Sequence, residues 1–171
     1  MSLHPTSFAD WQHYPSTLDP IHIAWLKNAK KSKTAFAVAD IEGVEISHKK
    51  FLTGVLLFSR KIELYSPEQN VGLLLPSSGG GAIASMAILS LGKTIVNLNF
   101  TAGKKALQSA AQQAEVKHIY TSRKFIDKMQ ERGKDLESFF PDSKLLMLED
   151  IKEEISTLSR IGTLLKAIFL P

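Results

Sequence analysis

The residues best suited to chemistry in this 171-residue chain form a serine- and glycine-rich turn, Pro76 to Gly81. The turn follows an apolar run, Val71 to Leu75, and opens a second apolar segment, which predicts a strand–turn–helix unit. Backbone N–H groups at the start of such a helix can hold a phosphate. The next lysine, however, is Lys93 at the far end of that segment, so the lysine of a phosphate loop is missing. Its absence favours the other interpretation, in which the glycines allow tight packing of strand against helix.

Other catalytic and metal-binding patterns are incomplete. Gly92-Lys93-Thr94 looks like the end of a phosphate loop, but it lies after a helical segment and before a strand, the reverse of the required order. A chain without cysteine has no thiol nucleophile, thiolate metal site or disulfide. The histidines lie too far apart in sequence for a local metal motif: His4, His13, His22, His48 and His118. We therefore predict no catalytic residue and no metal ligand in this chain.

Charge and hydropathy argue against two further classes of protein, those that bind nucleic acid and those that span a membrane. Lys and Arg number 21 against 17 Asp and Glu, a net charge of +4, and the basic residues are spread along the chain without interleaved aromatic residues. This pattern predicts no nucleic-acid partner. No apolar run approaches the roughly 18–20 residues that a membrane span needs.

The middle of the chain alternates between strand-like and helix-like segments. Helices are expected over residues 79–91 and 104–114 and, after an N-cap at Ser122, through Met129. Strands are expected over residues 71–75, 94–98, 118–121 and 144–148. Helical connections of this length force parallel pairing, so the fold class is α/β, a mostly parallel sheet flanked by helices. Ligands of such sheets bind beyond the carboxyl ends of the strands, here in the loops that begin at Pro76, Asn99 and Thr121.

The two ends of the chain differ from this middle part. Residues 1–33 are expected to form an irregular arm and a short helix, and residues 34–46 a β-hairpin that leads into a helix capped by Ser47. An α/β subdomain therefore spans residues 34–150. Residues 151–171 predict an apolar amphipathic helix, which needs the remainder of the same polypeptide, a partner chain or a membrane surface to cover it.

Three stretches support a resemblance to a known family. They are Asn97 to Gly103 (Asn-Leu-Asn-Phe-Thr-Ala-Gly), Ala114 to Lys117, and Ile119 to Phe125. From about Thr34 onward the chain resembles the N-terminal part of acyl-acyl carrier protein synthetases, within the bifunctional family that also acts as 2-acylglycerophosphoethanolamine acyltransferase. The order of strand, proline, helix, strand and asparagine is shared by the whole adenylate-forming superfamily. The glycine-rich stretch after Pro76 departs from the family pattern.

The resemblance implies a two-step reaction. A fatty acid would be activated with ATP and magnesium to acyl-AMP, and the acyl group would pass to acyl carrier protein and finally to a lysophospholipid. It also implies a cytoplasmic enzyme, peripheral on the cytoplasmic face of the inner membrane.

The family's catalytic motifs do not occur in these residues, so the chain alone is expected to be inactive and to hold no cofactor. The resemblance leaves Ser78, Gly79, Asn99 and Thr101 as candidates that line a substrate cleft completed by another part of the enzyme. The alternative is a self-contained binding module or a degenerate pseudoenzyme of the same fold.

Overall fold

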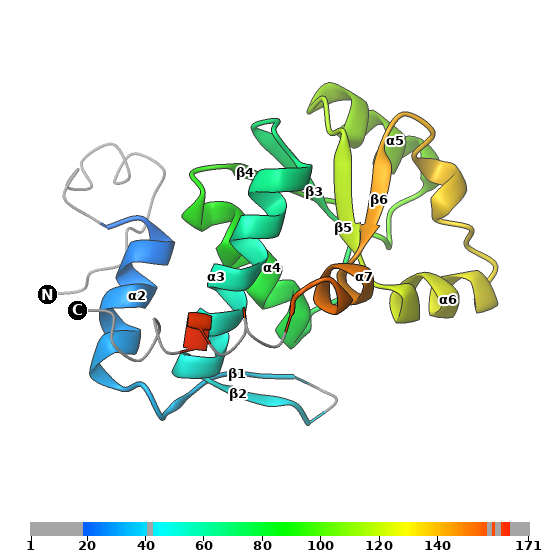
Figure 1. Cartoon of the computed structure of the whole chain (residues 1–171). Coiled ribbons are helices and arrows are strands. Elements are labelled where there is room, and N and C mark those ends of the chain that lie inside the picture. The colour runs from blue at the N-terminus through cyan, green and yellow to red at the C-terminus, as the bar shows by residue number, and fades with distance from the viewer. Residues whose placement is uncertain (1–18, 41–42, 157–158, 160–161, 165–171) are drawn as a thin grey trace, which may run out of the picture.

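The computed structural model describes residues 19–40, 43–156, 159 and 162–164 (Figure 1). The expected irregular arm lies outside these residues, as does most of the apolar helix expected over 151–171. No helix within the described part is long and apolar enough to cross a membrane.

The described chain begins with a helix and a hairpin, as predicted. Helix α2 (Ile21–Lys31) is followed by strands β1 (Phe36–Ala39) and β2 (Glu45–Ser47), which pair antiparallel. Helix α3 (His48–Tyr65) then starts where Ser47 Oγ accepts a hydrogen bond from Lys50 N at 3.4 Å. The predicted N-cap is therefore confirmed.

A four-stranded parallel sheet forms the centre of the fold. Its strands are β3 (Asn70–Leu73), β4 (Thr94–Asn97), β5 (His118–Thr121) and β6 (Lys144–Met147), in the order β4-β3-β5-β6. The connecting helices are α4 (Gly79–Ser90), α5 (Lys104–Gln113) and α6 (Arg123–Glu131), with a 3₁₀ turn η1 (Glu137–Phe139) before β6. All strand pairs in this sheet are parallel, which confirms the predicted α/β class.

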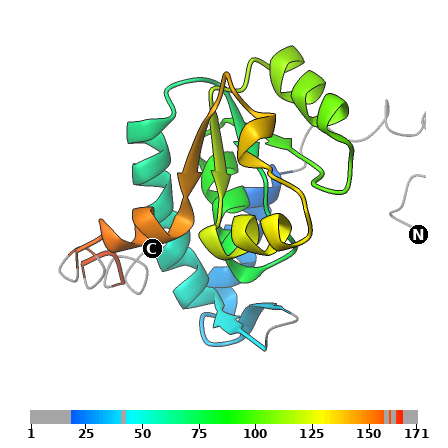
Figure 2. The same cartoon turned by 90° about the vertical axis from the view of Figure 1, so that its right-hand side faces the viewer.

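The two faces of the sheet bury separate apolar clusters. Helices α3 and α4 cover one face, around Val55, Ile62 and Ile88. Helices α5 and α6 cover the other face, around Leu107 and Ile126. In the turned view of Figure 2, α3 and α5 lie on opposite sides of the strands. A sheet buried on both faces explains why β3 continues into a run of apolar residues without alternation.

Close approach inside the sheet depends on one glycine. A Cβ atom at Gly72 would lie 2.7 Å from Ile119 Cγ1 and 2.8 Å from Val116 Cγ1, well inside van der Waals contact. Because Gly72 has no Cβ atom, β3 and β5 can pair while Ile119 and Val116 pack against the backbone of Gly72.

The end of the described chain departs from the predicted boundaries. Helix α7 starts at Leu148 and ends at Glu153, so Ile151 lies within a short helix and does not begin a long one. The carboxylates of Glu149 and Asp150 in its first turn favour this earlier start, because acidic side chains stabilise a helix N-terminus. The apolar face expected beyond Glu153 falls mainly outside the described residues.

Candidate functional site

The candidate site lies at the carboxyl edge of the parallel sheet. From β3 the chain first crosses to β4 on one side and later returns to β5 on the other side. This reversal is a topological switch point, where the helices that follow the two central strands lie on opposite faces. Here those helices are α4 after β3 and α6 after β5, so their N-termini flank the place where open α/β sheets bind ligands.

The N-terminus of α4 is already occupied by groups of the protein itself. Ser78 Oγ accepts a hydrogen bond from Gly81 N at 3.1 Å, and Asp40 Oδ2 accepts one from Gly79 N at 3.2 Å. Asp40 comes from the β1–β2 hairpin, where its Oδ1 also accepts from Val44 N at 3.1 Å. A carboxylate thus fills the position that a phosphate would take at a helix N-terminus.

The glycines of this turn serve packing. A Cβ atom at Gly79 would lie 2.8 Å from Ile46 Cδ1, so β2 and the start of α4 are in direct contact. At Gly81 an added Cβ would lie 3.2 Å from Pro76 O. These contacts support the packing interpretation of the glycine-rich turn over the phosphate interpretation.

A pocket of about 650 Å³ lies beside this turn, between the hairpin, the end of β3 and the start of α4. Its apolar walls come mainly from Val38, Leu73, Leu75, Pro76 and Ala82. Its polar groups are Asp40, Ser77, Ser78, Ser85 and Asn97. Apolar walls with a few polar groups are typical of small-molecule sites.

The predicted site residues divide into two groups. Ser78 lines the pocket, whereas Gly79, beside it in sequence, contacts Asp40 and Ile46 instead. Asn99 and Thr101 lie in the β4–α5 turn and bond to each other, because Asn99 Oδ1 accepts from Thr101 N at 3.0 Å and from Thr101 Oγ1 at 2.7 Å. Neither of these two side chains lines the pocket. A role for these four residues in a completed cleft stays a prediction.

Sequence reasoning missed the contributions of Asp40 and Asn97. Asn97 is the last residue of β4, so its place at the end of a parallel strand was a signal that could have found it. Asp40 gave no such signal, because only the packing of the hairpin against α4 brings it to Gly79, 39 residues later in the chain.

The N-terminus of α6, on the other side of the switch point, is also capped. Ser122 Oγ accepts a hydrogen bond from Phe125 N at 3.1 Å, and Glu149 Oε2 accepts one from Arg123 N at 3.0 Å. The guanidinium of Arg123 lies 2.6 Å from Asp150 Oδ1, and this hydrogen bond raises the pKa of Arg123. Residues of α7 therefore hold the start of α6.

Buried polar contacts join β5 to its neighbours near this edge. Thr121 Oγ1 donates to Leu74 O at 2.7 Å, and the hydroxyls of Tyr120 and Ser66 lie 2.9 Å apart. Burial raises the pKa of Tyr120 to about 12. The fully buried phenol is thus kept neutral, which suits a structural role.

A cluster of titratable groups lies between α3 and the end of α7. Glu154 Oε2 accepts hydrogen bonds from Lys61 Nζ, at 2.7 Å, and from the Tyr65 hydroxyl. The bond to Lys61, followed by the bond to Tyr65, lowers the pKa of Glu154. The same carboxylate raises the pKa of Lys61 and of Tyr65. The cluster is exposed and ties the end of α7 to α3.

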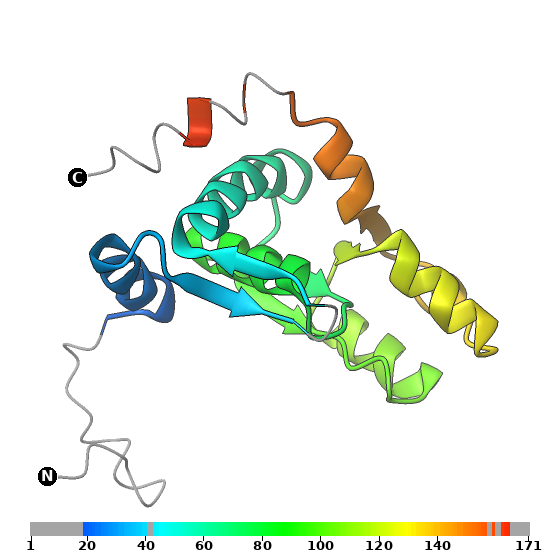
Figure 3. The ribbon, with the colours of Figure 1, turned by 90° about the horizontal axis from the view of Figure 1, so that it is seen from below.

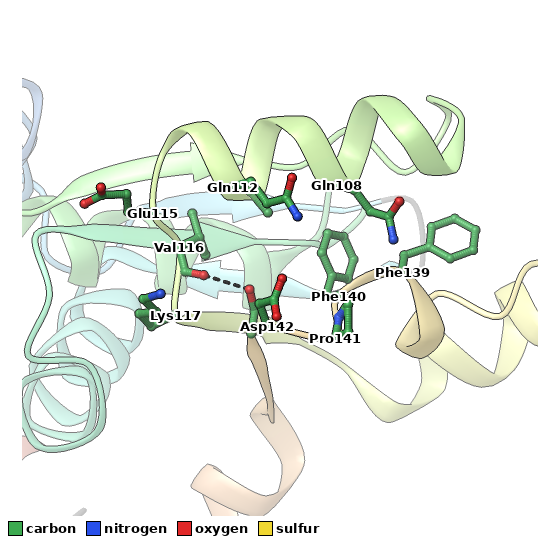
Figure 4. Close-up of a pocket in the computed structure, with 11 residues that line it drawn as sticks. Gln108, Gln112, Glu115, Val116, Lys117, Phe139, Phe140, Pro141 and Asp142 are labelled. Atoms are coloured by element: carbon green, nitrogen blue, oxygen red, sulfur yellow. Dashed lines mark hydrogen bonds between the residues drawn. The ribbon is translucent and has the colours of Figure 1, made fainter.

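The opposite, amino edge of the sheet carries a smaller pocket of about 370 Å³ (Figure 4). Phe139 and Phe140 face the amides of Gln108 and Gln112 across it in Figure 4. Ser143 Oγ donates to Val116 O at 2.7 Å, the dashed line in that view. The pocket lies away from the switch point and gathers no set of groups that would perform catalysis.

The described residues contain no group of three or more His, Asp or Glu side chains that could hold a metal ion. Their carboxylates are instead used as helix caps and in ion pairs, as at Asp40, Glu149 and Glu154.

Comparison with known proteins places this geometry in a structural class. No known protein-family profile matches the chain. The N-terminal subdomain of NpsA from Klebsiella oxytoca is similar over 80% of this chain and 33% of that chain, with a TM-score of 0.62 and 10% identity. VinN in complex with 3-methylaspartate is similar over 87% and 38%, with a TM-score of 0.66 and 12% identity. The nonribosomal peptide synthetase FmoA3, bound to α-methyl-L-serine-AMP, is similar over 87% and 17%, with a TM-score of 0.65 and 14% identity.

The fold is that of the N-terminal subdomains of adenylate-forming enzymes. This likeness confirms the predicted fold class. The chain spans only 17% to 38% of the three structures it resembles. At such low identity the likeness assigns no substrate and no catalytic residue to this chain.

Proposed function

We propose that this chain is the N-terminal subdomain of an ATP-dependent, adenylate-forming synthetase that activates a fatty acid. In this proposal the fatty acid carboxylate attacks the α-phosphate of ATP, pyrophosphate leaves, and the acyl group passes from AMP to an acyl carrier protein thiol. The final acceptor is a lysophospholipid, and the enzyme acts at the cytoplasmic face of a membrane. Magnesium bound to the nucleotide would neutralise phosphate charge.

The observation that carries the proposal is the match of most of this chain to the N-terminal subdomain of adenylate-forming enzymes. The acyl carrier protein branch rests on the stretches at Asn97 to Gly103 and Ile119 to Phe125, which resemble that branch.

The chemistry of the larger pocket suits the apolar part of a substrate. Asp40 lines it together with Leu73, Leu75 and Pro76. A carboxylate repels phosphate, so the pocket favours an acyl chain over the triphosphate of ATP. We propose that this pocket contacts the acyl chain, while groups outside the 171 residues hold the nucleotide and perform the transfer.

The test is fatty-acid-dependent exchange of pyrophosphate into ATP, measured on the product of the complete reading frame that contains this chain. We expect exchange from that product and none from the 171 residues alone. Absence of exchange from the complete product with every fatty acid chain length would reject a fatty acid ligase.

A second candidate is a self-contained binding module, whose ligand would lie in the larger pocket between the hairpin, the end of β3 and the start of α4. Isothermal titration of the 171 residues separates the two candidates. We expect no binding of ATP with magnesium, because Asp40 fills the helix N-terminus. Stoichiometric binding of ATP by the chain alone would support the binding module.

A further inference from the structure

Lysines from two separate segments meet on one surface of the molecule. Lys31 ends α2, and Lys49 and Lys50 lie in the first turn of α3. The two segments are joined by a backbone hydrogen bond in which Lys49 N donates to Lys33 O at 3.0 Å. Figure 3 shows α2 beside the hairpin and the start of α3. The end of α2 and the start of α3 thus lie side by side.

Few acidic residues of the described chain lie near these lysines in sequence, and the nearest to Lys49 is the exposed Glu45 of β2. The sequence contains no acidic residue between Pro20 and Ala39, a stretch with four lysines. Asp19 is paired with Lys27 at 2.7 Å, and Asp40 bonds to Gly79 and Val44 at the far end of β1. Lys30 and Lys33 border the same surface but also interact within the protein. The positive charge of this surface is therefore assigned to Lys31, Lys49 and Lys50.

A large apolar side chain lies next to this charge. Phe36, the first residue of β1, is 64% exposed and pairs with Ser47, directly before α3. An aromatic ring at the surface beside lysines is typical of a face that rests on the headgroup region of a bilayer. We name Lys31, Lys49, Lys50 and Phe36 together the lysine face.

The type of basic residue indicates whether the partner of this surface is an acidic protein or a lipid bilayer. The first arginine of the chain is Arg60, so this region uses lysine alone. Protein interfaces are enriched in arginine and depleted in lysine. Lysine is a strongly hydrated point charge, and clusters of it bind the diffuse negative charge of anionic membranes.

We propose that the lysine face binds an anionic phospholipid bilayer, with the lysines at the headgroup phosphates and the Phe36 ring at the interface. The binding is peripheral and needs neither nucleotide nor the ligase reaction. It rests on the membrane location in the proposed function and assigns a surface to it, but it can be tested separately from the ligase reaction.

The test is flotation of the full 171-residue chain with vesicles of phosphatidylcholine containing about 30 mol% phosphatidylglycerol. We expect binding to these vesicles and none to pure phosphatidylcholine. Binding should weaken steeply between about 0.1 M and about 0.5 M salt, because screening shortens the reach of the lysine charges.

The decisive variant combines Lys31→Gln, Lys49→Gln and Lys50→Gln. A lysine near an anionic bilayer contributes a factor of about five, so the triple variant should bind about a hundredfold more weakly. The matched control combines Lys105→Gln, Lys117→Gln and Lys128→Gln, three exposed lysines elsewhere, with the same change in net charge. The control should bind like the unchanged chain, and circular dichroism verifies that both variants are folded.

Phe36→Ser tests the apolar part of the lysine face. Because Phe36 is mostly exposed in the free protein, the substitution should leave the fold intact and weaken binding by about three- to tenfold. This loss should persist at high salt, unlike the loss from the lysine variants.

Three outcomes would overturn the proposal. One is the absence of binding to the anionic vesicles, and another is an equal loss from the control triple, which would show attraction by net charge only. The third is lysine-dependent binding of an acidic carrier protein without any vesicle binding, which would assign the lysine face to a protein partner.

Discussion

The N-termini of α4 and α6 flank the same switch point and are capped in the same way. In each, a serine hydroxyl accepts from the N–H three residues later, Ser78 from Gly81 and Ser122 from Phe125, both at 3.1 Å. In each, a distant carboxylate accepts from the first N–H of the helix, Asp40 at 3.2 Å and Glu149 at 3.0 Å.

The two helix starts differ in what surrounds the caps. The start of α4 is rich in glycine, contacts Ile46 of the hairpin and borders the larger pocket. The start of α6 is rich in charge, and its Arg123 side chain is exposed and paired with Asp150. Glycines after a parallel strand therefore need not indicate a phosphate site, since here they make room for another element of the protein.

The largest loss of stability is expected from adding a side chain at Gly79. Gly79→Val places a Cβ atom 2.8 Å from Ile46 Cδ1, so the end of the Ile46 side chain must move, and we expect a loss of about 1–3 kcal/mol in the free energy of unfolding, measured in urea. Arg123→Val, at the equivalent position of α6, should cost much less, because that side chain is exposed.

A double-mutant cycle tests the cause of this loss. In an Ile46→Ala background the loss of stability caused by Gly79→Val should be smaller, because the Ile46 Cδ1 atom that the new side chain would contact is absent. An unchanged cost would mean that packing against the hairpin is not the reason for glycine here.

Removal of the distant carboxylates should have the next largest effect. Asp40 accepts two backbone hydrogen bonds, from Gly79 N and Val44 N, so Asp40→Ala should cost about 1–2 kcal/mol. Glu149→Ala loses one such bond at α6 and should cost about half as much. Phosphate should then stabilise Asp40→Ala against heat more than it stabilises the unchanged chain. An equal effect on both proteins would show that Asp40 does not fill the anion position.

Replacing the serine N-caps should cause smaller losses of stability, which should be nearly equal at the two helices. Ser78→Ala and Ser122→Ala each remove one N-cap hydrogen bond and should each cost about 1 kcal/mol. Replacement by Asp at either position should retain most of the stability, since Asp is an equally good N-cap. A much larger loss for Ser78→Ala than for Ser122→Ala would contradict the equivalence of the two caps.

The smallest effect should come from Glu154, which ties α7 to α3 and so supports the α6 side only. Its bonds to Lys61 and Tyr65 stabilise the fold above the ordinary pKa of 4.5 for Glu154, and this stability is lost as pH falls through the lowered pKa. The contribution of Lys61 is present below its ordinary pKa of 10.5 and is lost as pH rises through the raised pKa.

Urea unfolding of Glu154→Gln and the unchanged chain should therefore differ most near neutral pH and converge at both extremes. The difference should also shrink in high salt, because the cluster is exposed. A difference that stays constant across pH would show that the hydrogen-bond geometry, and not the charge of Glu154, holds α7.

The local structure could be predicted from the sequence alone. The alternation of strands and helices, the hairpin after residue 33, and the caps at Ser47 and Ser122 depend on hydrophobic periodicity and on hydrogen bonds between residues three positions apart. Parallel pairing followed as well, because the connecting segments were long enough to require it. Such features need no knowledge of distant contacts.

The role of the glycine-rich turn depends on contacts between residues far apart in the sequence. Asp40 reaches Gly79 across 39 residues, Ile46 packs against the same glycine, and Glu149 caps α6 from a helix whose start the sequence placed too late. The strand order, which creates the switch point, and the pocket at Asn97 also arise from long-range packing. Whether a helix N-terminus binds a phosphate or a carboxylate of its own chain depends on which group the rest of the fold places there. The residues of the turn alone do not show which group this is.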